Sequence, residues 1–146
     1  MKKYLPDYLF LFSIAGVIIL FDQWTKSLVR ANLAVSEIYR PDLWISQYVR
    51  IVHWTNYGAA FGIFSNASDV FMLLALITIG AFIFSYRKLP SHAWLSRVSI
   101  ALISGGAFSN AFDRMIRDGK VVDYVHVQLT PTFSNVSNLA DHAVTV

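Results

Sequence analysis

Long apolar runs separated by short polar clusters dominate the chain. Residues 4–25, 69–86 and 94–112 are apolar over lengths close to the ~20 residues that a helix needs to cross a bilayer, so each is predicted to form a spanning helix. A fourth helix is expected to start at about residue 139, with most of it missing at Val146. The pattern predicts an all-α polytopic membrane protein in one domain over residues 1–146.

Two shorter segments between the apolar runs have a different pattern. Residues 48–54 and 121–127 are rich in β-branched and aromatic residues, which is typical of strands. Both lie between predicted spans on the same side of the membrane, so a small sheet is expected there. The third span contains the small residues Ser104, Gly105, Gly106 and Ala107. Such residues allow membrane helices to approach closely.

Composition supports lipid as the main solvent. Hydrophobic residues make up 55% of the chain and charged residues only 14%, whereas soluble domains carry about 25% charged residues. The absence of cysteine excludes disulfides, cysteine-ligated zinc and thiol catalysis. The net charge of +3 is spread along the chain, so nucleic acid is not expected as a partner. The four histidines have no ligand spacing, and we expect neither a metal nor a cofactor.

Polar clusters stand at the ends of the apolar runs, all on one side of the predicted bundle. They are Asp22-Gln23-Trp24-Thr25-Lys26, Asn56-Tyr57-Gly58-Ala59-Ala60-Phe61, Asn110-Ala111-Phe112-Asp113-Arg114 with the later Asp123, and Asn138-Leu139-Ala140-Asp141. Polar groups at membrane depth are costly and usually serve a function. The spacing of Asn110, Asp113 and Arg114 puts them on one helix face. Arg114 then pairs with Asp113 or holds a substrate carbonyl. Asp22 is expected to anchor its helix end through backbone N–H groups or through Lys26.

Asp123 and Asp141 are the remaining candidates for chemistry. Asp123 is flanked by Val122 and Tyr124, and Asp141 follows Ala140 at a helix start. Apolar surroundings raise the pKa of a carboxyl group, and two adjacent carboxyl groups tend to share one proton. One can then activate water as a base while the other donates a proton to a scissile carbonyl. This is the chemistry of an aspartic peptidase.

The polar clusters resemble the motif series of the lipoprotein signal peptidase (signal peptidase II) family. Asp-Gln-x-Thr-Lys, Asn-x-Gly-Ala-Ala-Phe, Gly-Gly-Ala-x-x-Asn-x-x-Asp-Arg with Gly-x-Val-Val-Asp-Tyr, and Asn-x-Ala-Asp occur in the family's order between residues 22 and 141. The resemblance implies that Asp123 and Asp141 are the catalytic pair. It implies substrate-binding or site-supporting roles for Asn56, Asn110, Arg114, Asn138, Asp22 and Asp113. One departure is Ser109, where the family usually has glycine.

The resemblance also implies an activity and a location. It implies an enzyme that removes signal peptides from diacylglyceryl-modified prolipoproteins, cleaving just before the lipidated cysteine, without a metal. The implied partners are these substrates, membrane lipid and globomycin-type inhibitors, and a monomer is expected. The implied location is the bacterial inner membrane, which the chain crosses several times. The implied fold is a four-transmembrane-helix bundle with a small extracytoplasmic sheet, and the active site would lie near that face.

Charge alone does not support this orientation. The side with the polar clusters carries seven of the 12 Lys and Arg residues, and the opposite side carries five. The positive-inside rule therefore leans toward the reverse orientation. Trp44, Trp54 and Trp94 are assigned to the aromatic belt at the membrane interface rather than to a binding cage.

Two other classes of protein remain as alternatives. A non-enzymatic membrane protein, such as an assembly factor or a small transporter subunit, predicts a polar path at mid-membrane. Here the polar residues gather at one end of the spans instead. A soluble partner-binding protein with apolar helices is the second alternative, and three segments of near-bilayer length oppose it.

Overall fold

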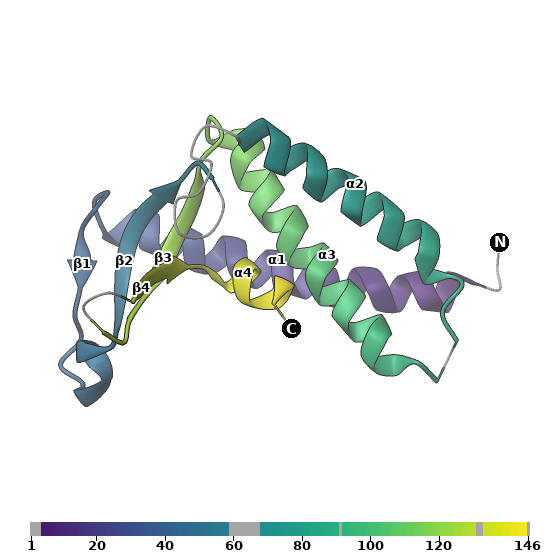
Figure 1. The fold of residues 1–146 in the computed structure, drawn as a ribbon, viewed down its shortest axis with the longest axis horizontal. Coiled ribbons are helices and arrows are strands. Elements are labelled where there is room, and N and C mark those ends of the chain that lie inside the picture. Colours follow the sequence, from purple (N-terminus) through teal and green to yellow (C-terminus); the bar gives the residue numbers. More distant parts are fainter. Residues whose placement is uncertain (1–3, 59–67, 91, 131–132, 146) are drawn as a thin grey trace.

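The computed structural model describes residues 4–58, 68–90, 92–130 and 133–145. Three long helices, α1 (Leu5–Asn32), α2 (Ser68–Tyr86) and α3 (Trp94–Ile116), form one part of the molecule. A small antiparallel sheet lies at one end of these helices, and the short helix α4 (Leu139–Val144) packs against α3 (Figure 1). Ala59, Ala60 and Phe61, which belong to the second motif, lie outside the described residues.

The three predicted apolar runs form helices, and two of these helices are longer than predicted. α2 matches its predicted bounds within one residue, whereas α1 continues to Asn32 and α3 continues to Ile116. The extra turns of α1 are stabilised by packing on the sheet, because Val29 is buried against Val122 and Tyr124. Tertiary contact thus extends a helix beyond the apolar run that predicted it.

Two of the described helices, α1 and α2, are long and apolar enough to cross a membrane. None of the most apolar window of α2 is buried within the protein, so that surface is available to lipid. The predicted third span, α3, is not one of these two, and its buried face carries the charged residues Arg97 and Asp113. The described helices therefore do not confirm a bundle of four transmembrane helices.

The sheet has the strand order β1-β2-β3-β4, with every neighbouring pair antiparallel. Its strands are β1 (Ile38–Tyr39), β2 (Val49–Asn56), β3 (Val121–Gln128) and β4 (Ser134–Ser137). The two predicted strands are confirmed as β2 and β3. The sequence did not predict β1 and β4, because both are short and β4 is polar. A 3₁₀ turn, η2 (Trp44–Gln47), precedes β2.

Small residues on α3 bring the other helices close, as predicted for Ser104–Ala107. A Cβ atom at Gly105 would lie 2.8 Å from the carbonyl oxygen of Ala15 on α1. A Cβ atom at Gly106 would overlap the carbonyl oxygen of Ala140 on α4. These close contacts of α3 with α1 and α4 bring the polar residues of the three helices together beside the sheet.

Candidate active site

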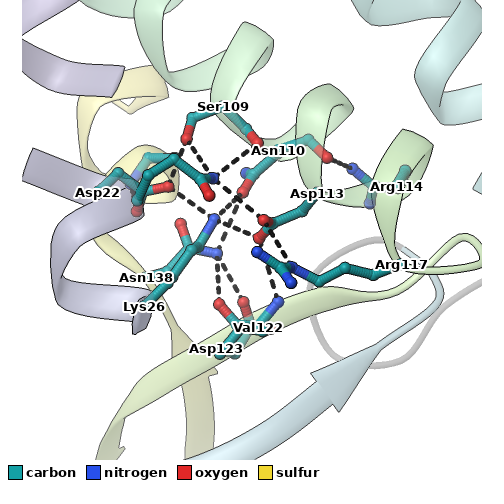
Figure 2. A network of polar contacts seen from close by, with 12 residues as sticks. Asp22, Lys26, Ser109, Asn110, Asp113, Arg114, Arg117, Val122, Asp123 and Asn138 are labelled. Atoms are coloured by element: carbon teal, nitrogen blue, oxygen red, sulfur yellow. Dashed lines mark hydrogen bonds and ion pairs between the residues drawn. The ribbon is translucent and has the colours of Figure 1, made fainter. Parts of the chain in front are cut away.

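The structure brings together the polar residues that the sequence predicted from separate segments. They come from the C-terminal half of α1, the end of β2, the last turns of α3, the start of β3, and the junction of β4 with α4. Figure 2 shows the members of this set on α1, α3 and β3, together with Asn138. The residues are Asp22, Asn56, Asn110, Asp113, Arg114, Asp123, Asn138 and Asp141. Their contacts divide them into two groups, one around Asp123 and Asp141 and one around Lys26.

Asn138 joins the two candidate catalytic carboxylates. It is the N-cap of α4: its side-chain oxygen accepts a hydrogen bond from the Asp141 backbone N–H at 2.9 Å, and its own N–H donates to Asp141 Oδ2 at 3.1 Å. This reciprocal arrangement is a capping box, which satisfies N–H groups that a helix start leaves unpaired. The same side chain donates from Nδ2 to Asp123 Oδ1 at 2.6 Å. The helix cap therefore also sets the position of Asp123 relative to Asp141.

Two further amides hold the carboxylates from the other side. Asn110 Nδ2 donates to Asp141 Oδ1 at 2.8 Å, and Asn56 Nδ2 donates to Asp123 Oδ2 at 3.1 Å. Within the described residues, no ion pair includes Asp123 or Asp141. Amide donors orient a carboxylate without supplying a positive charge, so they leave its proton available for exchange.

The pKa of Asp123 is raised to about 7, first by burial and then by the negative charge of Asp141. Hydrogen bonds from Asn56 and Asn138 oppose this rise, and so does the charge of Lys26. Asp123 is 2% exposed. Burial disfavours the charged form of a carboxyl group, and a neighbouring carboxylate disfavours it further. As the sequence predicted, Asp123 therefore binds its proton near neutral pH.

Both carboxylates line a cavity of about 490 Å³. Its polar wall also includes Asn56, Asn110 and Arg114, and its apolar wall includes Phe71, Ala75, Ala107 and Val144. The cavity therefore presents two carboxylates on one side and a surface suited to an apolar chain on the other. Its size is within the range of small-molecule and peptide side-chain pockets, about 300–1,000 Å³.

Arg114 contributes to the cavity rather than to the charged group. Its guanidinium donates to the carbonyl oxygen of Gly58 at 2.9 Å and to that of Asn110 at 3.4 Å. The predicted alternative in which Arg114 pairs with Asp113 is wrong, because Asp113 forms its ion pairs with Lys26 and Arg117. Adjacent residues on a helix do not face each other, whereas Arg117 lies one turn after Asp113 and Lys26 reaches Asp113 from α1.

Lys26 is at the centre of a second, fully buried group. Its ammonium lies 2.6 Å from Asp22 Oδ2 and 2.9 Å from Asp113 Oδ2, and all three side chains have no exposed surface. Lys26 also donates to Asn110 Oδ1 at 2.9 Å, which connects this group to the amide that holds Asp141. Arg117 adds a second cation at 3.1 Å from Asp113. The negative charges of Asp22 and Asp113 are thus balanced by the positive charges of Lys26 and Arg117.

Asp22 anchors the start of α4 as well as its own helix. Its Oδ1 accepts a hydrogen bond from the Ala140 backbone N–H at 3.0 Å, next to Asp141, and its Oδ2 is bound by Lys26. The predicted pairing with Lys26 is confirmed, but the predicted contact with the end of its own helix is wrong, because α1 continues to Asn32 and the backbone N–H bound by Asp22 belongs to α4. Ser109 also donates to Asp22 Oδ2, at 2.6 Å.

From the sequence, Lys26 was predicted only as a partner of Asp22, and no role in the site was predicted for Ser109. The spacing of Asp22 and Lys26, one helical turn apart, predicted their pairing. Nothing in the sequence predicted that Lys26 would also bind Asp113 and Asn110, because these contacts depend on how α1 and α3 pack. Among the described residues, no group of His, Asp and Glu side chains is arranged to hold a metal ion.

Comparison with known families gives one result over nearly the whole chain. The sequence profile of a family described as signal peptidase (SPase) II matches residues 14–146. A lipoprotein signal peptidase of Desulfitobacterium hafniense is 34% identical over 131 residues, covering 90% of this chain and 82% of that protein. A lipoprotein signal peptidase of Staphylococcus carnosus is 32% identical over 146 residues, covering 100% of this chain and 89% of that protein.

Solved structures give the same result for the fold. A bacterial membrane enzyme determined at 2.3 Å by the in meso method matches with a TM-score of 0.81 and 26% identity, covering 92% of this chain and 80% of that one. A second bacterial membrane enzyme, determined at 1.9 Å by the same method, matches with a TM-score of 0.78 and 26% identity. The arrangement of helices and sheet is therefore that of a known membrane enzyme.

Proposed function

This chain belongs to the signal peptidase II family, and from that membership we propose that it is an aspartic endopeptidase that removes signal peptides from diacylglyceryl-modified prolipoproteins. Cleavage would occur just before the lipidated cysteine. The family makes the chain a peptidase and a membrane protein. We propose the aspartic mechanism and the site of cleavage in addition to this family assignment.

The observation that carries this proposal is the contact set of Asp123 and Asp141. Two carboxylates line one cavity, are joined by Asn138, and have amides rather than cations as their described side-chain partners. With its pKa raised to about 7, Asp123 retains a proton near neutral pH, and we assign the ionised role to Asp141. An acid and a base then face the same space, which is the requirement for general acid–base attack of water on an amide.

The chemical steps follow from this protonation state. Ionised Asp141 takes a proton from water as the water oxygen bonds to the scissile carbonyl carbon, and Asp123 gives its proton to the carbonyl oxygen. The tetrahedral intermediate then collapses: Asp141 gives its proton to the leaving nitrogen as the carbon–nitrogen bond breaks, and Asp123 takes a proton back from a hydroxyl group of the intermediate. A carboxyl group and a free amine result, and both carboxylates return to their starting states. The pair titrates as a unit, so the activity should have a bell-shaped pH profile.

Arg114 and Asn56 are proposed to hold the substrate beside this pair. Arg114 already binds one backbone carbonyl, that of Gly58, and its Nε is buried without a hydrogen-bond partner among the described residues. A peptide in the cavity would supply a carbonyl acceptor for it. The apolar wall formed by Phe71, Ala75 and Val144 suits the apolar part of a signal peptide or a lipid chain.

We propose that the chain is a monomer that crosses the bacterial inner membrane several times, as a four-helix bundle with the sheet outside the cytoplasm. The apolar helices α1 and α2 support this arrangement. The buried polar groups of α3 are compatible with a third span, because Lys26 and Gln23 on α1 satisfy Asp113 from within the protein. The lipid-modified substrate would then reach the cavity from the outer face of the membrane.

The direct test is cleavage of a diacylated prolipoprotein by the purified chain in detergent. Cleavage before the lipidated cysteine should occur, should require the lipid, and should be blocked by globomycin. It should persist in strong chelators, since no residue of the proposed mechanism binds a metal. Equal cleavage of the unlipidated precursor would contradict the proposed specificity, and chelator-sensitive cleavage restored by zinc would contradict the mechanism.

A further inference from the structure

Exposed apolar side chains gather at one end of the sheet, away from Asp123. Trp44 in η2 is 81% exposed, and Leu43 before it is 59% exposed. Leu129, just after β3, is also 59% exposed, and Phe133 and Tyr48 are exposed as well. We call Leu43, Trp44, Tyr48, Leu129 and Phe133 the distal patch. A contiguous apolar surface on a part of a protein that faces water usually marks a binding surface.

Described contacts hold the members of the distal patch at the same end of the sheet. The Gln128 backbone N–H donates to the carbonyl oxygen of Tyr48 at 2.8 Å, and that of Leu129 donates to Phe133 at 3.2 Å. Arg50 holds η2 in place by donating to the carbonyl oxygens of Ser46 and Gln47, each at 3.3 Å. In Figure 1, η2, the end of β3 and the start of β4 lie at the end of the sheet farthest from α2.

Basic side chains border the distal patch. Residues 39–50 contain two arginines, Arg40 and Arg50, and one acidic residue, Asp42. Arg50 on β2 pairs with His126 on β3, and Arg40 directly follows β1, so both cations lie at this end of the sheet. Their positive charges, after burial, lower the pKa of His126. Aromatic and basic side chains together are typical of surfaces that lie in the headgroup region of a bilayer with anionic lipid.

We propose that the distal patch inserts into the outer interface of the same membrane that the helices cross, with Arg40 at anionic headgroups. This rests on the membrane arrangement proposed above. A bilayer is favoured over a protein partner because the patch combines an exposed tryptophan with arginine. Tryptophan and tyrosine rings concentrate at the membrane interface, where their apolar body and polar edge are both satisfied.

The insertion would have a consequence for the site. β2 starts beside the distal patch and ends at Asn56, and its residue Trp54 pairs with Asp123 on β3. One end of the strand would then be held by the bilayer and the other by the carboxylate pair. The sheet would lie along the membrane surface, with Asn56 and Asp123 facing a substrate that arrives from the lipid.

The chain contains no cysteine, so single introduced cysteines can report depth in the bilayer. A nitroxide at Leu43→Cys leaves Trp44 intact and reports on the distal patch. Two exposed positions give the limits: Leu76→Cys, midway along α2, for lipid, and Ala34→Cys, just past the end of α1, for water. Relaxation by oxygen, which concentrates in lipid, is compared with relaxation by a water-soluble nickel chelate.

In vesicles containing anionic lipid, we expect the oxygen-to-nickel ratio at position 43 to fall between those at positions 76 and 34. Adding Trp44→Ser should lower the ratio at position 43 to that at position 34. Trp94→Ser, which removes another exposed tryptophan remote from the patch, should leave the ratio unchanged. Because Trp44 is almost fully exposed, its replacement should not alter the unfolding temperature, which serves as the check on folding.

Three results would overturn the proposal. The first is a water-like ratio at position 43 with Trp44 present. The second is spin–spin broadening at position 43 that grows with the protein-to-lipid ratio, which would identify a second copy as the occupant. The third is an unchanged ratio after Arg40→Gln or in purely zwitterionic vesicles, which would exclude the anionic headgroups. None of these measurements uses cleavage, so failure here and failure of the proposed peptidase activity are distinguishable.

Discussion

Two pairs of buried carboxylates lie close together in this protein, and their partners differ. Asp22 and Asp113 share the ammonium of Lys26, and Asp113 also pairs with Arg117. Asp123 and Asp141 instead accept hydrogen bonds from the amides of Asn56, Asn110 and Asn138. The charges of Asp22 and Asp113, the neutralised pair, are balanced by cations. Asp123 and Asp141, the oriented pair, are held in place by amides that carry no charge.

The difference shows how neighbouring carboxylates can take different roles. A buried carboxylate with a fixed cation stays ionised, so it can hold helices together but cannot exchange a proton near neutral pH. A buried carboxylate beside another carboxylate has its pKa raised and can carry a proton. Asn110 connects the two pairs, since its oxygen accepts from Lys26 while its nitrogen donates to Asp141. The neutralised pair thereby orients an amide that holds the proton-carrying pair.

The largest expected effect is the loss of cleavage when either carboxylate of the oriented pair is replaced. Asp123→Asn or Asp141→Asn should reduce cleavage of a lipidated prolipoprotein by about 10²–10⁴-fold or more, because each removes the acid or the base. The fold should survive, since an asparagine keeps the shape and one acceptor oxygen. Asp118→Asn is the matched control, because Asp118 is exposed and its positive φ of 50° suits asparagine. Near-normal cleavage by either dyad variant would refute the assignment.

Removing a cation from the neutralised pair should lower the stability of the protein. Lys26→Met leaves Asp22 and Asp113 buried together with only Arg117 beside them, so we expect the free energy of unfolding to fall by about 3–5 kcal/mol. Denaturant or thermal unfolding in detergent measures it. Lys88→Met, at an exposed lysine, should change stability by less than about 0.5 kcal/mol. A Lys26→Met protein as stable as the parent would mean that the buried group does not hold α1 to α3.

The pH dependence of stability tests the raised pKa of Asp123 in the oriented pair. In the folded chain the pKa of Asp123 is raised from 3.8 to about 7, so the folded chain binds this proton more tightly than the unfolded chain does. Between these pH values the folded state holds more protons, and the free energy of unfolding should fall as pH rises, by up to about 4 kcal/mol.

Asp123→Asn removes this proton and should flatten the fall. The measurement is unfolding between pH 4 and pH 8 for both proteins, over the window that the raised pKa defines. Asp118→Asn should keep the slope of the parent. An identical slope in the Asp123→Asn protein would show that another group carries the proton.

The smallest expected effect concerns the contact that brings α4 to α3. A Cβ atom at Gly106 would overlap the Ala140 carbonyl oxygen and lie 3.0 Å from Val144 Cγ2. Gly106→Ala should therefore displace α4, reduce cleavage and destabilise the protein by about 1–3 kcal/mol. Gly80→Ala is the matched control, because nothing lies within 4 Å of its Cβ position. If both substitutions behave alike, close approach at Gly106 does not position Asp141.

The sequence predicted most of the elements and which polar residues would lie close together. Apolar runs predicted α1, α2 and α3, β-branched segments predicted β2 and β3, and spaced motifs predicted which carboxylates and amides would meet. These features are local in the chain, because hydrophobic length and residue alternation can be read without knowing neighbours in space. The short strands β1 and β4 have no such local signal and exist because β2 and β3 offer edges to pair with.

Only the tertiary structure decided how the charges are partnered. The sequence left open a pairing of Asp113 with Arg114, yet the packing of α1 on α3 places Lys26 at Asp113, and Arg114 binds the carbonyl oxygen of Gly58 beside the cavity. Likewise, the sequence predicted an anchor role for Asp22, but its contact with Ala140 depends on α4 packing beside α3. The reason is physical: whether a buried carboxylate is neutralised or holds a proton depends on which cation lies within a few ångströms. In this protein Lys26 reaches Asp113 from a distant segment, whereas the pairs Asp22–Lys26 and Asp113–Arg117 each lie one helical turn apart.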